Sequence, residues 1–119
     1  MRFTNKKSKV PVSTEAEIQA EFYHQCRIVG LQCRLELMTR AGRPDCIIGS
    51  YDGQLALLVV EVKTSPDKLD HKQLAKYRWL KLDVLTLCSS DEIPRLVSRI
   101  QTLLPDIDGV PWRDLEKGG

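Results

Sequence analysis

Residues 55–60, Leu-Ala-Leu-Leu-Val-Val, are the longest apolar run in the chain and constrain its fold more than any other segment. The run lies inside residues 54–63, which we predict to form one strand. Successive residues of a strand point to opposite faces, so a strand in which every residue is apolar is buried on both faces, as in a sheet covered by helices on each side. Six residues are too few to cross a bilayer. The segment therefore predicts the interior strand of an α/β domain.

The rest of the chain predicts helices and strands around this strand. Thr14 and Glu17 match a capping box that begins a helix, and Gly30 ends that helix after about Val29. The further expected elements are strands at 32–38 and 45–49, a turn at 51–53, a helix at about 68–81, a strand at 84–88 and a helix at 91–104. The predicted order is α-β-β-β-α-β-α, a meander of three strands followed by a crossover into a fourth.

Charge is distributed unevenly along the 119 residues, although the net charge is only +2. Residues 1–9 hold four basic side chains and no acid, and residues 63–81 hold six against two acids. A surface that faces a polyanion and a pair of solvated segments both account for this pattern. The length predicts one domain, at residues 13–104, between a basic arm at 1–12 and a tail at 105–119 that is peripheral apart from Trp112.

The four cysteines, Cys26, Cys33, Cys46 and Cys88, contain no closely spaced pair of the kind that binds zinc. We expect free thiols that pack like small apolar side chains in a reducing compartment. The basic N-terminus is followed by no apolar stretch, so no signal peptide is visible. These features predict an intracellular, cytoplasmic protein with no membrane contact.

Glu61 and Lys63 are two residues apart on the predicted strand, so both project from one face. Alone, such a pair is typical of a strand end that emerges into water. Asp45 opens the preceding strand and changes this interpretation if it shares the face of Glu61. Two carboxylates about 4 Å apart repel by about 4 kcal/mol at an effective dielectric constant of 20, and a divalent cation removes that cost. Oxygen ligands favour Mg²⁺ or Mn²⁺.

The length of the turn decides the face of Asp45. A two-residue turn at 52–53 places Asp45 opposite Val60, on the face away from Glu61. A three-residue loop at 51–53, with Gly53 left-handed, places Asp45 on the face of Glu61. We predict the three-residue loop.

An acid also lies on the apolar stripe of the first helix. At 100° per residue this stripe consists of Ile18, Phe22, Cys26 and Val29. Glu15 lies in the middle of it, and a carboxylate there is costly unless it has a partner or a metal ion.

Gly42-Arg43-Pro44-Asp45, a hairpin and Glu61-Val62-Lys63 together resemble the PD-(D/E)xK nuclease superfamily, in particular the VRR-Nuc domains and the archaeal Holliday-junction resolvases. Glu15 and Gln19 match the E-x-x-x-Q pattern of the first helix in these families, and Gln73 matches a glutamine of the helix after E-x-K. The resemblance covers roughly residues 13–88. It implies a restriction-endonuclease-like core with a mixed central sheet flanked by helices.

The resemblance also implies roles. Asp45, Glu61 and the Val62 carbonyl would bind Mg²⁺, for which Mn²⁺ substitutes, and Lys63 would act on the water nucleophile or the scissile phosphate. Glu15 would contribute through water on the metal, and Gln73 would position Lys63 or the phosphate. The expected nucleic-acid contacts are Gln19, Arg40, Arg43, Lys68, Lys72 and Lys76. Tyr77 and Trp79 are expected to be packing residues.

The expected function is therefore that of a homodimeric Mg²⁺-dependent endonuclease that hydrolyses DNA, selectively at branched, flap or junction structures in replication, repair or recombination. Two alternatives stay open. One is a catalytically silent nucleic-acid-binding module of the same fold. The other is a generic α/β interaction protein in which the motifs are coincidental.

Overall fold

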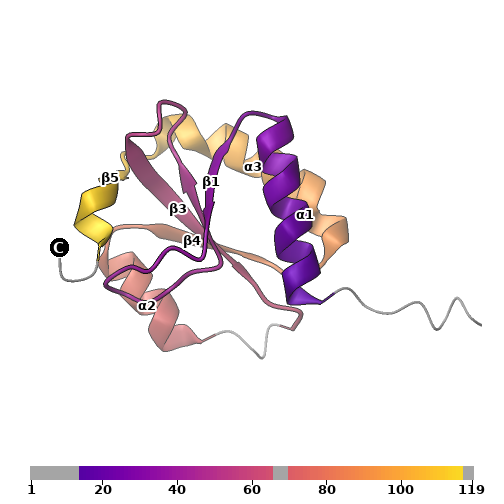
Figure 1. The fold of residues 1–119 in the computed structure, drawn as a ribbon, viewed down its shortest axis with the longest axis horizontal. Helices are drawn as coiled ribbons and strands as arrows, with labels where there is room; N and C mark the ends of the chain where they lie inside the picture. The colour runs from indigo at the N-terminus through magenta and orange to yellow at the C-terminus, as the bar shows by residue number, and fades with distance from the viewer. Residues whose placement is uncertain (1–13, 66–69, 117–119) are drawn as a thin grey trace, which may run out of the picture.

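The computed structural model describes residues 14–65 and 70–116, so the basic arm at 1–12 and Lys68 lie outside the described residues. Figure 1 shows the elements in chain order. They are α1 (Glu15–Ile28), β1 (Gln32–Leu35), β2 (Cys46–Gly49), β3 (Leu55–Val62), α2 (His71–Trp79), β4 (Asp83–Leu87), η3 (Ser90–Glu92), α3 (Ile93–Leu103), η4 (Leu104–Asp106), β5 (Val110–Pro111) and η5 (Trp112–Leu115). The elements labelled η are short 3₁₀ helices.

The strands form one mixed sheet in the order β1-β2-β3-β4. β1, β2 and β3 run antiparallel to one another, whereas β4 is parallel to β3. β3 is an interior strand, and its residues from Ala56 to Val62 are all buried. The predicted α/β class and the prediction of a strand buried on both faces are therefore confirmed.

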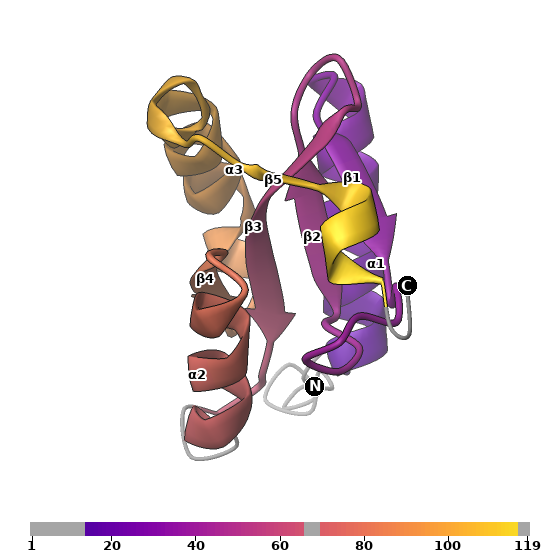
Figure 2. The same cartoon turned by 90° about the vertical axis from the view of Figure 1, so that its left-hand side faces the viewer.

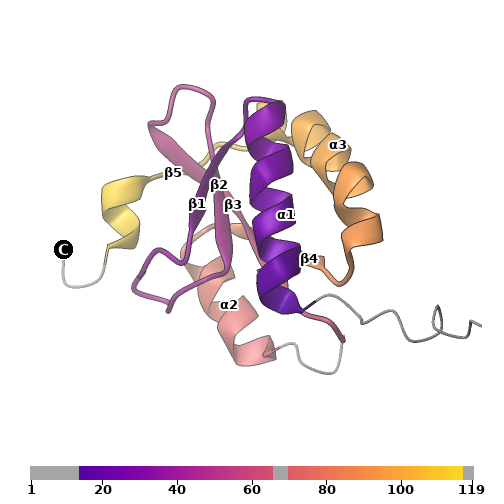
Figure 3. The ribbon, with the colours of Figure 1, turned by 45° about the vertical axis from the view of Figure 1, so that its right-hand side comes forward.

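Helical segments cover both faces of the sheet. α1 and α3 lie side by side over one face, where they pack against Leu58, Val60 and Val62 (Figures 1 and 3). α2 and the C-terminal segment pack on the other face, against Val59. Glu61 has the parity of Val59, so it points toward the face covered by α2.

The predicted start of the first helix is confirmed. The Thr14 hydroxyl accepts a hydrogen bond from the Glu17 amide at 3.1 Å, and the Glu17 carboxylate accepts one from the Thr14 amide at 2.7 Å. Ile18, Phe22 and Cys26 are buried as expected. Val29 was wrongly assigned to this stripe, because it lies past the last helical residue and is 38% exposed.

Most other boundaries shift by one or two residues, and two elements differ more from the prediction. The strand expected at 32–38 ends at Leu35, because Glu36 adopts a positive φ of 51° that interrupts the extended backbone. The helix expected at 68–81 has Asp70 as its N-cap, whose carboxylate accepts from the amides of Lys72 and Gln73. It buries Leu74 and Tyr77.

Residues of the C-terminal segment between 105 and 116 pack on the fold, so the expectation that this segment is peripheral apart from Trp112 is wrong for these residues. β5 lies in the connection from α3 to η5 and pairs with the start of β3 (Figure 2). The Leu115 side chain is fully buried, and the Leu115 carbonyl accepts a hydrogen bond from the Arg40 amide at 2.8 Å. Glycine and proline in the segment made it resemble coil, and the contacts that order it come from distant residues.

All four cysteines are free, and Cys26 and Cys46 are buried. Among the helices of the described ranges, none is long and apolar enough to cross a membrane.

Candidate active site

The β2–β3 hairpin places Asp45 directly opposite Glu61. Cys46 pairs with Val60, and the register shifts between Ile48 and Gly49 as the strands approach the turn. Extended by one residue, this pairing sets Asp45 against Glu61, so both side chains lie on one face.

The turn itself is not the predicted three-residue loop. The Ser50 amide donates to the Leu55 carbonyl at 2.9 Å, which leaves four residues, 51–54, in the loop. The Asp52 carboxylate stabilises this longer loop by accepting from the Ser50 hydroxyl and the Gln54 amide. With the four-residue loop alone, Asp45 would lie opposite Val60, on the face away from Glu61. The register shift moves the pairing by one residue and returns Asp45 to the face of Glu61. The two acids therefore share a face for a different reason from the one predicted.

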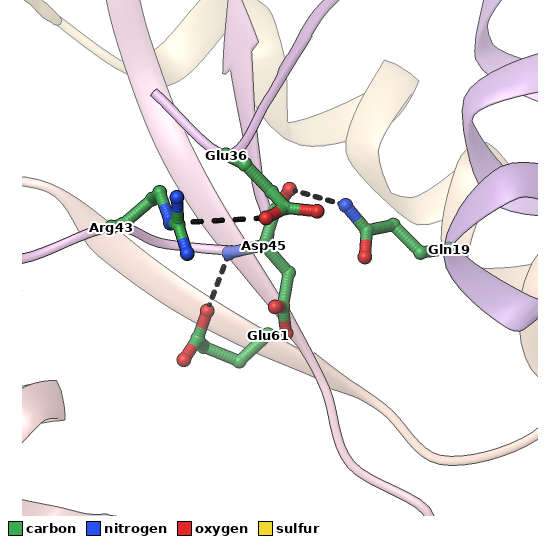
Figure 4. A network of polar contacts seen from close by, with 5 residues as sticks. All are labelled: Gln19, Glu36, Arg43, Asp45 and Glu61. Atoms are coloured by element: carbon green, nitrogen blue, oxygen red, sulfur yellow. Dashed lines mark hydrogen bonds and ion pairs between the residues drawn. The ribbon is translucent and has the colours of Figure 1, made fainter. Parts of the chain in front are cut away.

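Asp45 and Glu61 are joined by reciprocal bonds between side chain and main chain. The Asp45 amide donates to Glu61 Oε2 at 2.9 Å (Figure 4). The Val62 amide donates to Asp45 Oδ2 at 2.7 Å. These bonds replace a regular ladder at the end of the hairpin. A strand residue directs its carbonyl to the same side as its N–H, so the Val62 carbonyl faces Asp45.

Both carboxyl groups have pKa values above their usual range. Burial is the main cause for Asp45 and for Glu61, which is only 7% exposed. The accepted main-chain hydrogen bonds and the positive charge of Lys63 oppose this rise at both groups. The three predicted residues Asp45, Glu61 and Lys63 are thus brought together, with one cation facing two acids whose ionised forms are poorly solvated.

Glu15 reaches this end of the sheet from α1. Glu15 Oε2 accepts a hydrogen bond from the Thr64 amide at 2.9 Å, one residue after Lys63. Its negative charge raises the pKa of both Asp45 and Glu61, which places it within electrostatic range of them. The partner that the sequence required for Glu15 is therefore the main chain beyond β3.

Gln19 lies one helical turn after Glu15 and holds the main chain of Asp45. Gln19 Nε2 donates to the Asp45 carbonyl at 3.0 Å (Figure 4). On the other side of Asp45, Arg43 forms an exposed ion pair with Glu36 at 3.8 Å. Such a pair contributes little to stability, so the Arg43 guanidinium is available to another anion. Gln19 thus supports the main chain of Asp45. Arg43 lies at the rim of the site.

Gln73 supports the loop that precedes Asp45. Its Nε2 donates to the Ala41 carbonyl at 2.9 Å and to the Tyr77 hydroxyl at 2.7 Å. The negative charges of Glu61 and Asp45 add to burial in raising the pKa of Tyr77 to about 12. Gln73 therefore contacts the loop at 39–44 from its position on α2. The Tyr77 hydroxyl lies within electrostatic range of the two acids.

The remaining predicted contacts are less closely grouped. Arg40 is exposed on the same loop, and its guanidinium lies 5.5 Å from the centre of the Trp79 ring. Lys72 and Lys76 are exposed on α2. Trp79 is 72% exposed, so the expectation that it is a packing residue is wrong, whereas Tyr77 is buried as expected.

Gly42 gives a test of this loop. It has a φ of 122°, and a Cβ there would collide with Gln73 Nε2. We expect Gly42→Ala to lower the free energy of unfolding by about 1–3 kcal/mol, because it strains the backbone and displaces both Gln73 hydrogen bonds. Urea denaturation measures this change. Gly30→Ala is the control, since Gly30 also has a positive φ but no neighbour within 4 Å of a Cβ. Equal losses in the two variants would contradict the proposed contact.

The donor set at Asp45 fits a hard divalent cation. Within residues 14–65 and 70–116, no three His, Cys, Asp or Glu side chains form a metal-binding group. Mg²⁺ is nevertheless commonly bound through one or two carboxylates, with water and substrate phosphate completing its shell. Asp45 and Glu61 each commit one carboxylate oxygen to a main-chain amide. Carboxylate oxygens favour Mg²⁺ or Mn²⁺ over zinc, which prefers sites that include histidine or cysteine.

Sequence reasoning missed three participants in this site: Glu36, Thr64 and the Tyr77 hydroxyl. Tyr77 lies four residues after Gln73, so helical periodicity could have paired them. The contributions of Glu36 and Thr64 depend on tertiary contacts that no local pattern reveals.

Comparison of the chain with protein-family models, with curated proteins and with solved structures gave no match. The case for a function therefore rests on the residues and their geometry.

Proposed function

We propose that this chain is a metal-dependent endonuclease that hydrolyses phosphodiester bonds in intracellular DNA. The observation that carries the proposal is the placement of Asp45 opposite Glu61, with the charge of Lys63 lowering the pKa of both. A buried acid and a partly buried acid that lie side by side with raised pKa values are costly for a fold unless a cation compensates them. The resemblance to PD-(D/E)xK nucleases, and the restriction-endonuclease-like core that it implies, agree with the proposal.

The carboxylates of Asp45 and Glu61 and the Val62 carbonyl would hold the ion. A divalent cation there would supply a Lewis acid that polarises the phosphate and lowers the pKa of bound water. Lys63 adds a fixed positive charge where negative charge accumulates on the phosphate. Arg43 at the rim contributes a further positive charge toward the DNA backbone.

The supporting residues keep this set rigid. Gln19 fixes the carbonyl of Asp45, Glu15 fixes the chain just after Lys63, and Gln73 fixes the loop before Asp45. We propose that these three act as positioning residues, since each holds main chain beside a reacting group.

Cleavage of a labelled DNA panel tests the proposal. The panel contains duplex, single strand, flap and four-way junction, each incubated with Mg²⁺, Mn²⁺ or EDTA. We expect cleavage with either metal and none with EDTA, and faster cleavage of flap or junction than of duplex. Cleavage that persists in EDTA would refute the metal-dependent mechanism.

A catalytically silent DNA-binding module is the alternative. It predicts DNA binding in Ca²⁺ and no turnover in Mg²⁺ or Mn²⁺. The retention of two poorly solvated acids beside a lysine favours the enzyme, because binding alone does not require them.

A homodimer also remains a prediction, and a monomeric mass in light scattering at assay concentration would contradict it.

A further inference from the structure

An open groove of about 730 Å³ lies between the end of α2 and the C-terminal segment. Trp79 and Val110 line it together with three cations, Arg40, Lys81 and Arg113. Two acids of the C-terminal segment, Asp114 and Glu116, also line it. The groove therefore combines an aromatic ring with a small excess of positive charge.

Trp79 is the most exposed large apolar side chain in the described part of the chain, at 72%. An indole exposed to this degree gains little from packing within the fold. The Arg40 guanidinium lies 5.5 Å from the ring centre. An aromatic ring flanked by cations is the arrangement that binds single-stranded nucleic acid, because bases stack on the ring and phosphates meet the cations.

Lys81 places a second cation of the groove at the end of α2. It adopts a left-handed φ of 68° directly after the C-cap residue Leu80, and the Leu82 amide closes the helix end by donating to the Tyr77 carbonyl at 3.1 Å. The ordered end of the helix therefore fixes the position from which the Lys81 side chain extends.

The groove and the acid pair share structural supports. Arg40 belongs to the loop that Gln73 holds and that leads directly to Asp45. Gln73 and Trp79 are six residues apart on α2, about 9 Å along the helix axis. The groove is therefore connected to the acid pair through this loop and through α2, which carries both Gln73 and Trp79.

We infer that this groove binds an unpaired nucleotide of single-stranded DNA, with its base stacked on Trp79 and its phosphate near Arg40 and Lys81. The inference rests on the proposed nuclease function and deepens it. It names the substrate class as DNA that contains unpaired nucleotides. Duplex DNA without unpaired bases offers no base to the Trp79 ring.

Binding of a labelled oligo(dT) to the Glu61→Gln protein in EDTA tests the inference without turnover. We expect an added Trp79→Leu substitution to weaken binding about 5- to 100-fold, the range for loss of one stacked base. Arg40→Ala and Lys81→Ala should each reduce the slope of log K against log[salt] by about one. The matched controls are Tyr51→Leu, an exposed aromatic residue on the hairpin loop, and Arg99→Ala on α3, across the sheet.

Tryptophan fluorescence gives a direct measurement. The chain has two tryptophans, so Trp112→Phe leaves Trp79 as the only one. Oligo(dT) should quench the emission of this variant. The inference would be overturned if oligo(dT) left the Trp79 emission unchanged. It would also be overturned if the emission changed with protein concentration, because that indicates contact of Trp79 with a second copy of the chain.

The failures of the two proposals are distinguishable. If wild-type protein cleaves DNA and Trp79→Leu binds oligo(dT) as wild type does, the nucleotide site is refuted and the nuclease stands. If Trp79→Leu loses binding but no substrate is cleaved with metal, the nuclease is refuted and the nucleotide site stands.

Discussion

Glu61→Gln is expected to lower the rate of metal-dependent DNA cleavage by at least about 10²- to 10³-fold. The same substitution is expected to make the protein more stable. Glutamine retains an oxygen that can accept the hydrogen bond of the Asp45 amide, which Glu61 Oε2 accepts at 2.9 Å. The substitution removes a charge whose burial raises the pKa of Glu61, so it removes a cost that the ionised form imposes near neutral pH. We expect Tm in EDTA to rise by a few degrees.

Cleavage rates and thermal unfolding of the same preparations measure the two effects together. Glu17→Gln is the matched control, because glutamine also completes a capping box and Glu17 lies on the exposed side of α1. This control should cleave DNA at the wild-type rate. A Glu61→Gln protein that cleaves normally would remove Glu61 from the mechanism. Loss of both activity and stability would instead indicate that Glu61 has a structural role.

Mn²⁺ or Mg²⁺ is expected to raise Tm, and the rise should grow with pH. A cation at 100 times its dissociation constant adds about 2.7 kcal/mol, which corresponds to roughly 10 °C for a small domain. Because burial raises the pKa values of Asp45 and Glu61, the metal-free protein loses stability as pH rises through those values. A bound cation favours the ionised forms and reverses this sign.

Thermal unfolding from about pH 4 to pH 7, with Mn²⁺ or with EDTA, tests this linkage over the range in which raised carboxyl pKa values lie. The difference in Tm should be small at the acid end and largest near neutrality. Asp45→Asn should show almost no difference at any pH. A metal-induced rise that is independent of pH, or equal in Asp45→Asn, would place the cation elsewhere.

Several features could be predicted from local sequence because their causes are local. The capping box at Thr14 and Glu17 needs only residues three apart, and the burial of β3 follows from its unbroken apolar run. The E-x-K spacing fixes Glu61 and Lys63 on one face of a strand. The sequence also indicated that Glu15 required a partner, although it could not identify the Thr64 amide.

Other features depended on contacts between distant residues. The C-terminal segment carries no strong pattern, yet it pairs with β3 and buries Leu115 beneath α2. Trp79 is a large aromatic residue that was expected to pack, but α2 leaves it exposed to the groove. Local periodicity cannot show which neighbour, if any, covers a given side chain.

The acid pair shows where sequence and tertiary structure divide. Sequence by itself determined that Asp45 and Glu61 lie at adjacent ends of two paired strands. Whether they share a face depended on a parity set jointly by the loop at 51–54 and the register shift beside Gly49. Each change alone would have turned Asp45 away, because side chains alternate between faces at every residue. Only the tertiary structure, in which the two shifts compensate, decided that the acids meet.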